Sequence, residues 1–245
     1  MGLQFAAARA VSAVSTWGLK HVFHRPAANF PGKIALYADP RVIADLAPRL
    51  QKGSVCVVGT NGKTTACALA AHVLAGAGLA AAAVGNIGDP CIEAVAAGRT
   101  DVYVAEVSSY QLASTVRFAP NVAVLLNITP DHLHWHRSFE AYRDAKLKLL
   151  ANLPGVPGAV AVLDATNDVV RAEVRRLRAL DAGERGFSYV PLGTAAGLTG
   201  DMRAACGSDN AAFLDADGTL RVALGGGEHR AGRAVDLHDA LAAAE

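Results

Sequence analysis

The sequence predicts an α/β fold, with a mostly parallel sheet and helices on both faces. From residue 54 to residue 180, short apolar runs alternate with longer stretches of helical composition, the order that builds such sheets. The run 121–128 is almost entirely apolar, as expected of a strand that is covered on both faces. In sheets of this kind ligands bind beyond the carboxyl ends of the strands, which is where site residues are expected.

Composition restricts the class of protein further. Of the 245 residues, 52% are hydrophobic and 18% are charged, which describes a globular chain and excludes a disordered one. The net charge of +1 provides no general basic surface, so we expect no nucleic-acid partner. No apolar run is long enough for a membrane span. The four cysteines lack paired metal-ligand spacing and indicate buried core residues in a reducing, cytoplasmic compartment.

The N-terminal part, residues 1–53, is expected to be a helical and extended segment that packs on the core. Residues 1–19 form a predicted helix, and docking of this helix on a membrane surface or on a partner is the alternative. Residues 33–37 predict a short strand, and Asp39-Pro40 opens a helix that continues to residue 50. One side of the first helix is expected to carry its large apolar side chains, Leu3, Phe5, Val11, Val14 and Trp17.

Residues 54–235 are expected to form the main domain. Its predicted strands cover residues 55–58, 80–84, 101–107, 121–128 and 159–163, and its predicted helices cover 64–77, 89–97, 138–152 and 168–180. Residues 211–214 and 220–224 flank an Asp-Ala-Asp-Gly turn, which predicts a hairpin and an antiparallel extension of the sheet near the C-terminus. Residues 236–245 resemble the start of a further C-terminal domain that the sequence does not contain.

The stretch from Val55 to Thr65 is the strongest functional signal. Apolar residues end in Gly59-Thr60-Asn61-Gly62, and Lys63-Thr64-Thr65 then opens a helix, so the sheet is of the P-loop type. Amide groups at a helix N-terminus bind phosphate oxygens, while the lysine adds positive charge and the threonine a hydroxyl for Mg²⁺. Val57 stands where the usual loop has a further glycine, which indicates a shortened loop.

Polar side chains also follow two of the apolar strands. Glu106 ends the strand 101–107, and a carboxylate there needs a cation such as the Mg²⁺ of bound ATP; capping of a neighbouring helix is the alternative. The segment 127–132 closes the next strand and ends in His132, a candidate metal or substrate ligand. His134 and His136 add imidazoles, but their spacing lacks the further ligands of a structural zinc site.

Lys146 is an unusual lysine because it lies within the apolar stripe of the predicted helix 138–152. Tyr142 precedes it by four residues and Leu150 follows it by four, so all three share one helix face. A buried lysine has a lowered pKa, and its neutral amine can react with CO₂ to give a carbamate. The alternative is a lysine whose charged end reaches solvent along its apolar stem.

In combination these segments resemble the Mur ligase family of peptidoglycan synthesis, specifically its central ATPase domain. The resemblance covers residues 54 to 165 and is closest to the D-glutamate-adding branch. It rests on the phosphate loop and four further motifs: Gly85-Asn86-Ile87-Gly88, Glu106-Val107-Ser108-Ser109-Tyr110-Gln111-Leu112, Asn127-Ile128-Thr129-Pro130-Asp131-His132-Leu133, and Phe139-Glu140-Ala141-Tyr142 through Lys146.

The resemblance implies an ATP-dependent ligase that forms an amide bond through an acyl-phosphate, adding D-glutamate to UDP-N-acetylmuramoyl-L-alanine. It implies ATP bound by residues 59–65 and two Mg²⁺ ions. It implies metal ligation by Thr64, Glu106, His132 and a carbamylated Lys146, with Lys63, Glu106, His132 and Lys146 in catalysis. It also implies that Asn86, Ser108 and Ser109 contact the muramoyl substrate, a peptidoglycan precursor.

Two alternatives remain open. Residues 30–36 resemble the start of MurT, the amidating subunit of lipid II isoglutaminyl synthase, which would imply a glutaminase partner. Alternatively, the chain is a nucleotide-binding module that is inactive on its own. We expect this of the isolated chain, because amide formation depends on proximity and the domain that brings the amino acid is absent.

Overall fold

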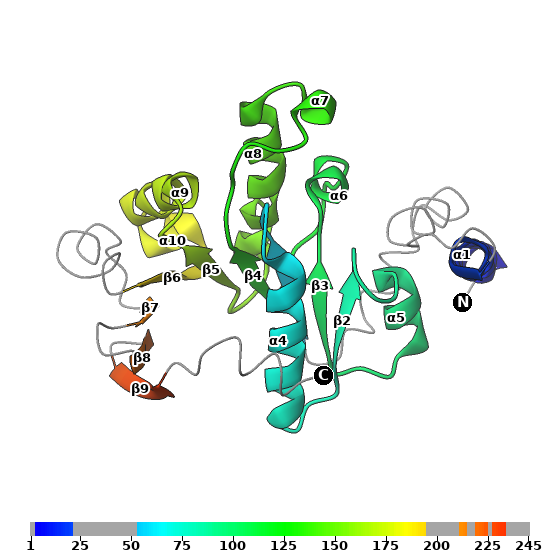
Figure 1. Cartoon of the computed structure of the whole chain (residues 1–245), viewed down its shortest axis with the longest axis horizontal. Helices are drawn as coiled ribbons and strands as arrows, with labels where there is room; N and C mark the ends of the chain where they lie inside the picture. Colours follow the sequence, from blue (N-terminus) through cyan, green and yellow to red (C-terminus); the bar gives the residue numbers. More distant parts are fainter. Residues whose placement is uncertain (1–2, 22–52, 195–210, 215–218, 225–226, 234–245) are drawn as a thin grey trace.

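The computed structural model describes residues 3–21, 53–194, 211–214, 219–224 and 227–233, and all of its described strands belong to one sheet (Figure 1). The strand order is β2-β3-β1-β4-β5-β6-β7-β8-β9. The strands are β1 (Gly53–Val58), β2 (Ala81–Gly85), β3 (Val102–Glu106), β4 (Val122–Leu125), β5 (Val160–Asp164), β6 (Ser188–Thr194), β7 (Ala211–Leu214), β8 (Thr219–Leu224) and β9 (Gly227–Arg233).

Most of this sheet is parallel, as the sequence predicts. Strands β1 to β7 pair in parallel, and β1 lies between β3 and β4 with Val55 beside both Val104 and Val122. Strand β8 runs antiparallel to β7 and β9. The carboxyl ends of β2, β3, β1 and β4 therefore lie at one edge of the sheet, where the loops that follow them can meet.

Helices cover both faces of the sheet. Helix α4 packs on one face, against β1, β2 and β3, and lies in front of the sheet in Figure 1. Helices α5, α6, α8 and α9 pack on the other face. The helices are α1 (Leu3–His21), α4 (Lys63–Gly76), α5 (Cys91–Ala97), α6 (Ser109–Ala113), α7 (Leu133–His136), α8 (Phe139–Leu147), α9 (Asp168–Ala179) and α10 (Ala182–Arg185), with 3₁₀ turns η2 (Lys148–Leu150) and η3 (Leu153–Gly155).

The core follows from the alternation of side chains along β1. Cys56 and Val58 point into the larger core with Leu125 of β4. Val57 points to the opposite face and packs against Cys67 of α4. Successive strand residues point to opposite faces, so a strand that is covered on both sides must be apolar throughout. Both cysteines are buried and free, in agreement with their expected place in the core.

The predicted helix 138–152 is shorter in the structure. Helix α8 starts after Ser138, whose hydroxyl accepts a hydrogen bond from the backbone N–H of Ala141, and it ends at Leu147. The chain then tightens into the 3₁₀ turn η2, a common way of satisfying the last carbonyl groups of a helix. Lys146 therefore stands in the last turn of α8, with its side chain still on the buried face.

Helix α1 forms where the sequence predicts it and lies beside α5 (Figure 1). Two of the apolar side chains expected on one side of the helix are nevertheless exposed. Val14 and Trp17 are 70% and 61% exposed, whereas the small residues Ala8 and Ser12 are fully buried. Small side chains let two helices approach closely, so the packed side of α1 is not the side with the largest apolar residues.

Several sequence predictions fall outside the described residues. These are the strand at 33–37, the helix at 40–50, the MurT-like stretch 30–36 and the segment 236–245. Within the described ranges, no helix has both the length and the apolar character needed to cross a membrane.

Candidate functional site at the carboxyl edge of the sheet

The loop Gly59–Gly62 joins β1 to α4 at the carboxyl edge of the sheet. Gly62 has a positive φ of 78°, a conformation that residues with a Cβ rarely adopt, and it precedes the first helical residue, Lys63. The first backbone N–H groups of a helix have no partner within the helix. Asn61, Thr64 and Thr65 are exposed, so this helix N-terminus is open to an anion from solvent.

Asn127 holds the loop in this shape from the neighbouring strand. Its Oδ1 atom accepts hydrogen bonds of 2.9 Å from the backbone N–H groups of Thr60 and Asn61, and its Nδ2 atom donates to the carbonyl of Asn61. Asn127 belongs to a predicted motif, but its support of the phosphate loop was not anticipated. The contact joins residues 66 and 67 positions apart, so no local pattern reveals it.

The predicted phosphate-binding lysine folds back over the same loop. The Nζ atom of Lys63 donates a 2.9 Å hydrogen bond to the carbonyl of Thr60. The hydroxyl of Thr60 lies 2.9 Å from the phenol oxygen of Tyr142, on α8. Loop, lysine and α8 therefore form one connected unit, and the lysine charge lies at the position where phosphate groups are expected.

Glu106 connects the phosphate loop to the loop after β2. It is 2% exposed, and its two carboxylate oxygens accept hydrogen bonds from the hydroxyl of Thr64, at 2.7 Å, and from the side-chain amide of Asn86, at 2.8 Å. These contacts come from side chains, so Glu106 is not a helix cap. A Cβ at Gly85 would lie 2.5 Å from the backbone oxygen of Glu106, so only glycine permits this close approach.

The oxygen atoms at this position suit Mg²⁺. The Thr64 hydroxyl and the Glu106 carboxylate are hard donors, and they lie beside the helix N-terminus where phosphate oxygens would complete the coordination. The described residues contain no group of three or more His, Cys, Asp or Glu side chains placed to hold a metal ion by themselves. Thr64 and Glu106 would supply two donors and leave the remaining coordination positions to phosphate oxygens and water.

Lys146 lies beneath the phosphate loop. It is 2% exposed, its Nζ atom donates a 2.6 Å hydrogen bond to the carbonyl of Gly59, and it lies 4.8 Å from the ring centroid of Tyr142. Burial, and then the charge of Lys63, lower the pKa of Lys146 to about 7. The amine does not reach solvent, so the alternative of a solvent-reaching lysine was wrong. The lowered pKa favours the neutral form of the amine.

His132 follows β4 in a left-handed backbone conformation, with φ of 52°. A residue other than glycine in this region is strained, and such strain gathers at functional sites. Its Nδ1 atom lies 3.4 Å from a carboxylate oxygen of Asp131, and its side chain is 40% exposed. Its ring lies near those of Tyr110 and Tyr142, which places an accessible imidazole beside α6 and α8.

The two predicted substrate serines have different surroundings. Ser108 is half-buried and caps α6 through a capping box with Gln111. Ser109 is 2% exposed, and its hydroxyl lies 3.0 Å from Nε2 of His136. A buried hydroxyl that is already paired with a histidine is poorly placed for direct contact with a ligand. Direct contact by Ser108 and by Asn86 remains a prediction.

The structure thus brings most of the predicted residues together. Direct hydrogen bonds link Lys63 to Thr60 of the loop, and Glu106 to both Thr64 and Asn86. Lys146 is linked to the loop by its bond to Gly59. His132 joins only through ring contacts, while Thr65 is exposed at the start of α4. Tyr142 was missed as a site residue; its place four residues before Lys146, on the same helix face, was the available signal.

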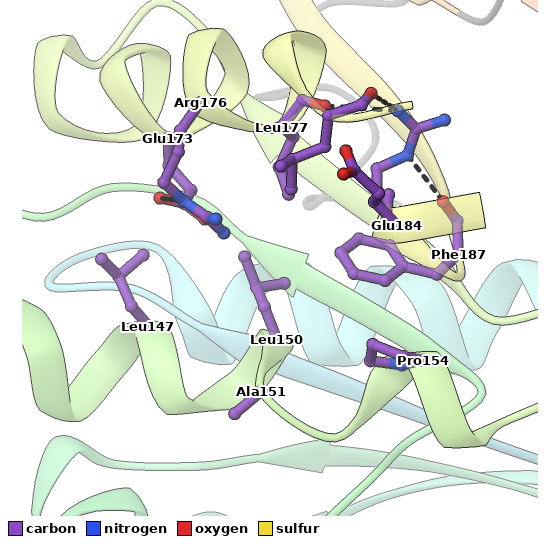
Figure 2. A pocket seen from close by; sticks show the side chains of 11 residues that line it. Leu147, Leu150, Ala151, Pro154, Glu173, Arg176, Leu177, Glu184 and Phe187 are labelled. Carbon is purple, nitrogen blue, oxygen red and sulfur yellow. Dashed lines mark hydrogen bonds and ion pairs between the residues drawn. The ribbon is translucent and has the colours of Figure 1, made fainter. Parts of the chain in front are cut away.

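A separate pocket of about 370 Å³ lies away from this site, between η2 and η3 on one side and α9 on the other (Figure 2). Leu150, Pro154, Leu177 and Phe187 line it, and the ion pair of Glu173 with Arg176 forms part of its wall. Leu177 is near the end of α9, which starts beyond the carboxyl end of β5 and returns toward the other edge of the sheet. The phosphate loop takes no part in this pocket.

Comparison with known protein families decides what this edge of the sheet represents. The model of the Mur ligase middle domain matches residues 57–191, more than half of the chain. This chain belongs to the Mur ligase family. The match begins within β1 and extends into β6, so it includes the phosphate loop, Glu106, His132 and Lys146.

Curated Mur ligases resemble the chain in sequence. UDP-N-acetylmuramoylalanine–D-glutamate ligase of Corynebacterium diphtheriae is 36% identical over 193 residues, which are 77% of this chain and 37% of that protein. The enzyme of the same name from Alkaliphilus metalliredigens is 52% identical over 110 residues, 44% of this chain and 24% of the relative. The chain thus spans well under half the length of these relatives.

Solved Mur ligases share the fold. A UDP-N-acetylmuramoyl-L-alanyl-D-glutamate–2,6-diaminopimelate ligase superimposes with a TM-score of 0.53 at 19% identity, over 78% of this chain and 41% of that one. The MurF ligase of Thermotoga maritima, solved in complex with ADP, gives a TM-score of 0.51 at 17% identity, over 77% and 41% of the two chains. At these identities the likeness concerns the fold alone.

Proposed function

We propose that this Mur ligase chain binds Mg·ATP at residues 59–65 and serves as the nucleotide-binding part of a ligase that adds D-glutamate to UDP-N-acetylmuramoylalanine. The observation that carries the proposal is the contact of Thr64 with Glu106 at the N-terminus of α4, beside Lys63. Donors for phosphate and for a nucleotide-bound cation meet at this one position. The names of the relatives support the choice of substrates, and the ADP complex of MurF supports the nucleotide.

The proposed reaction is acyl activation. A carboxylate oxygen of the precursor attacks the γ-phosphorus of ATP and ADP leaves, which gives an acyl-phosphate. The amine nitrogen of D-glutamate then attacks the acyl carbon, loses a proton, and phosphate leaves. Negative charge gathers at the phosphate in the first step, and Lys63 with the free amides of α4 is placed to stabilise it.

Metal ions would supply charge neutralisation at the same point. Thr64 and Glu106 would hold the nucleotide-bound Mg²⁺, and His132 with a carbamylated Lys146 would hold a second ion. Burial of Lys146 and its pKa of about 7 favour the carbamate, because only the neutral amine reacts with CO₂. Asn86, bonded to Glu106, would present its remaining polar atoms to the precursor.

Calorimetric titration of Mg²⁺ with a nonhydrolysable ATP analogue tests the nucleotide site. We expect the unchanged chain to bind and Lys63→Ala to lose at least about tenfold in affinity, the scale of one charge-assisted contact. Lys148→Ala is the matched control, because Lys148 is an exposed lysine that bonds the carbonyl of Ala113, away from the loop. Equal binding by Lys63→Ala and the unchanged chain would contradict the site.

The substrates need a separate test. In a ligase that contains this nucleotide-binding part, phosphate release from ATP should require both UDP-N-acetylmuramoylalanine and D-glutamate, and replacement of D-glutamate by ammonia should give no product. Product formation with ammonia alone would favour an amidating subunit of the MurT type. That subunit and its glutaminase partner stay sequence predictions, because residues 30–36 lie outside the described structure and the reported relatives are named as D-glutamate ligases.

A further inference from the structure

His136 is a buried histidine beside the site that the proposed chemistry leaves without a role. It ends the short helix α7 and is 7% exposed. Its Nε2 atom lies 3.0 Å from the hydroxyl of Ser109, and both groups are buried. Because a buried polar group costs free energy unless it is paired, this hydrogen bond fixes the position of both side chains.

Aromatic rings fix the plane of the His136 ring. Tyr110 of α6 stacks on it, with centroids 5.6 Å apart and an angle of 23° between the planes. Trp135 and Tyr142 meet it nearly edge-on, at 4.5 and 5.2 Å. Tyr142 also contacts the hydroxyl of Thr60 in the phosphate loop. A single histidine therefore connects the start of α6, the body of α8 and the phosphate loop.

The start of α6 is the part of this connection that matters for a substrate. Ser109 is the first residue of α6, Ser108 is its N-cap, and Glu106 ends the strand just before. A shift of Ser109 must move Ser108, a predicted precursor contact, relative to the carboxylate that bonds Thr64. A bond that holds Ser109 therefore also restricts the position of Ser108 relative to Glu106.

We propose that His136 is a positioning residue for the precursor, which acts by holding Ser109 and thereby Ser108 in place beside the phosphate loop. This inference rests on the proposed function of the chain as a Mur ligase that binds the precursor at this edge. Burial is the largest cause that lowers the pKa of His136 from its usual value. A neutral imidazole has one N–H and one lone pair, so it pairs with a hydroxyl in either direction.

Two substitutions separate this role from simple filling of the core. His136→Phe keeps an aromatic ring and removes the hydrogen bond, whereas His136→Gln keeps a polar group near the position of Nε2 and removes the ring. We expect His136→Phe to bind UDP-N-acetylmuramoylalanine about tenfold more weakly and His136→Gln to recover most of that loss. Affinity for Mg²⁺ with the ATP analogue should stay within about twofold in both variants.

Ser109→Ala and the double variant complete the test. Ser109→Ala should weaken precursor binding as much as His136→Phe, and the double variant no more than either single one, since all three remove the same bond. Ser109→Ala removes one oxygen atom only, so it tests the bond even where His136→Phe does not fold. Additive losses would overturn the proposal.

The outcomes also separate this inference from the proposed function. In one outcome, the unchanged chain and His136→Phe bind the precursor equally well, and His136→Gln does not bind it. This result would show that His136 only fills space, and it would not affect the proposed ligase function. Failure of the unchanged chain to bind the precursor, with Mg·nucleotide binding intact, would overturn the proposed substrate and the positioning role with it.

Discussion

The amine of Lys146 donates a 2.6 Å hydrogen bond to the backbone carbonyl of Gly59, the first residue after β1. The two residues are 87 positions apart, and the contact places the end of α8 directly beneath the phosphate loop. Because the amine is buried beside Lys63, its neutral form is favoured, and burial is the larger cause. This one relationship gives rise to two predictions.

The first prediction concerns stability against pH. The pKa of Lys146 is lowered from 10.5 to about 7 on folding, so between these values the unfolded chain binds more protons and native stability rises with pH. Lys146→Met lacks this dependence. We expect the wild type to gain on the order of 2–4 kcal/mol relative to Lys146→Met between pH 6.5 and pH 10. Denaturant unfolding at several pH values measures the difference, and parallel curves would refute it.

The second prediction concerns the carbamate itself. With ¹³C-labelled bicarbonate at about pH 8, a ¹³C carbamate signal should appear in the wild type, because the neutral amine is then the main form. The signal should disappear in Lys146→Met and persist in Lys148→Ala, which removes an exposed lysine two residues after Lys146. A signal that survives in Lys146→Met belongs to another amine.

The contact of Thr64 with Glu106 predicts how Mg²⁺ affects nucleotide binding. Thr64→Val keeps the shape of the side chain but removes the hydroxyl, so Mg²⁺ should strengthen binding of the ATP analogue about tenfold less than in the wild type. Thr64→Ser restores the hydroxyl and should restore the effect of Mg²⁺. Calorimetry with and without Mg²⁺ measures it; an unchanged Mg²⁺ effect in Thr64→Val would exclude this threonine as a metal ligand.

Substitution of Asn127 should affect both nucleotide affinity and stability, because this side chain supports the phosphate loop. Asn127→Ala removes the bonds to Thr60 and Asn61, and we expect a loss of about 1–3 kcal/mol in unfolding free energy and a weaker nucleotide site. Asn152→Ala is matched to it, because Asn152 bonds the carbonyls of Val116 and Phe118 far from the loop. It should lose similar stability and keep its affinity. Equal affinities in both variants would deny Asn127 a role in the loop.

Gly85 predicts a purely steric effect. Gly85→Ala places a Cβ 2.5 Å from the backbone of Glu106 at a φ of 101°, so it should destabilise the fold by at least about 3 kcal/mol. Gly98→Ala shares the positive φ but meets open space, and should cost only about 1–2 kcal/mol. Thermal and denaturant unfolding measure both; equal losses would mean that the close approach of β2 and β3 relaxes.

The sequence predicted those features that depend on local pattern. Apolar runs located the central strands, glycines and lysine located the phosphate loop, and helical spacing placed Lys146 on a buried face. The contacts of Asn127 and Tyr142 with the loop were not predicted, because they join residues 66 to 82 positions apart. In α1, the apolar pattern grouped Val14 with the other large apolar residues, yet Val14 is exposed in the structure. The pattern of one helix does not show which other elements pack against it.

Support of the phosphate loop by Asn127 has a consequence for the thermodynamics of binding. A loop that orders only around its ligand loses conformational entropy at that moment, which lowers the affinity. Here the backbone amides of Thr60 and Asn61 are already fixed by a side chain that follows the next strand of the sheet. The loop is thus ordered when β1 folds against β4, and the proposed nucleotide would bind to a loop that is already in place.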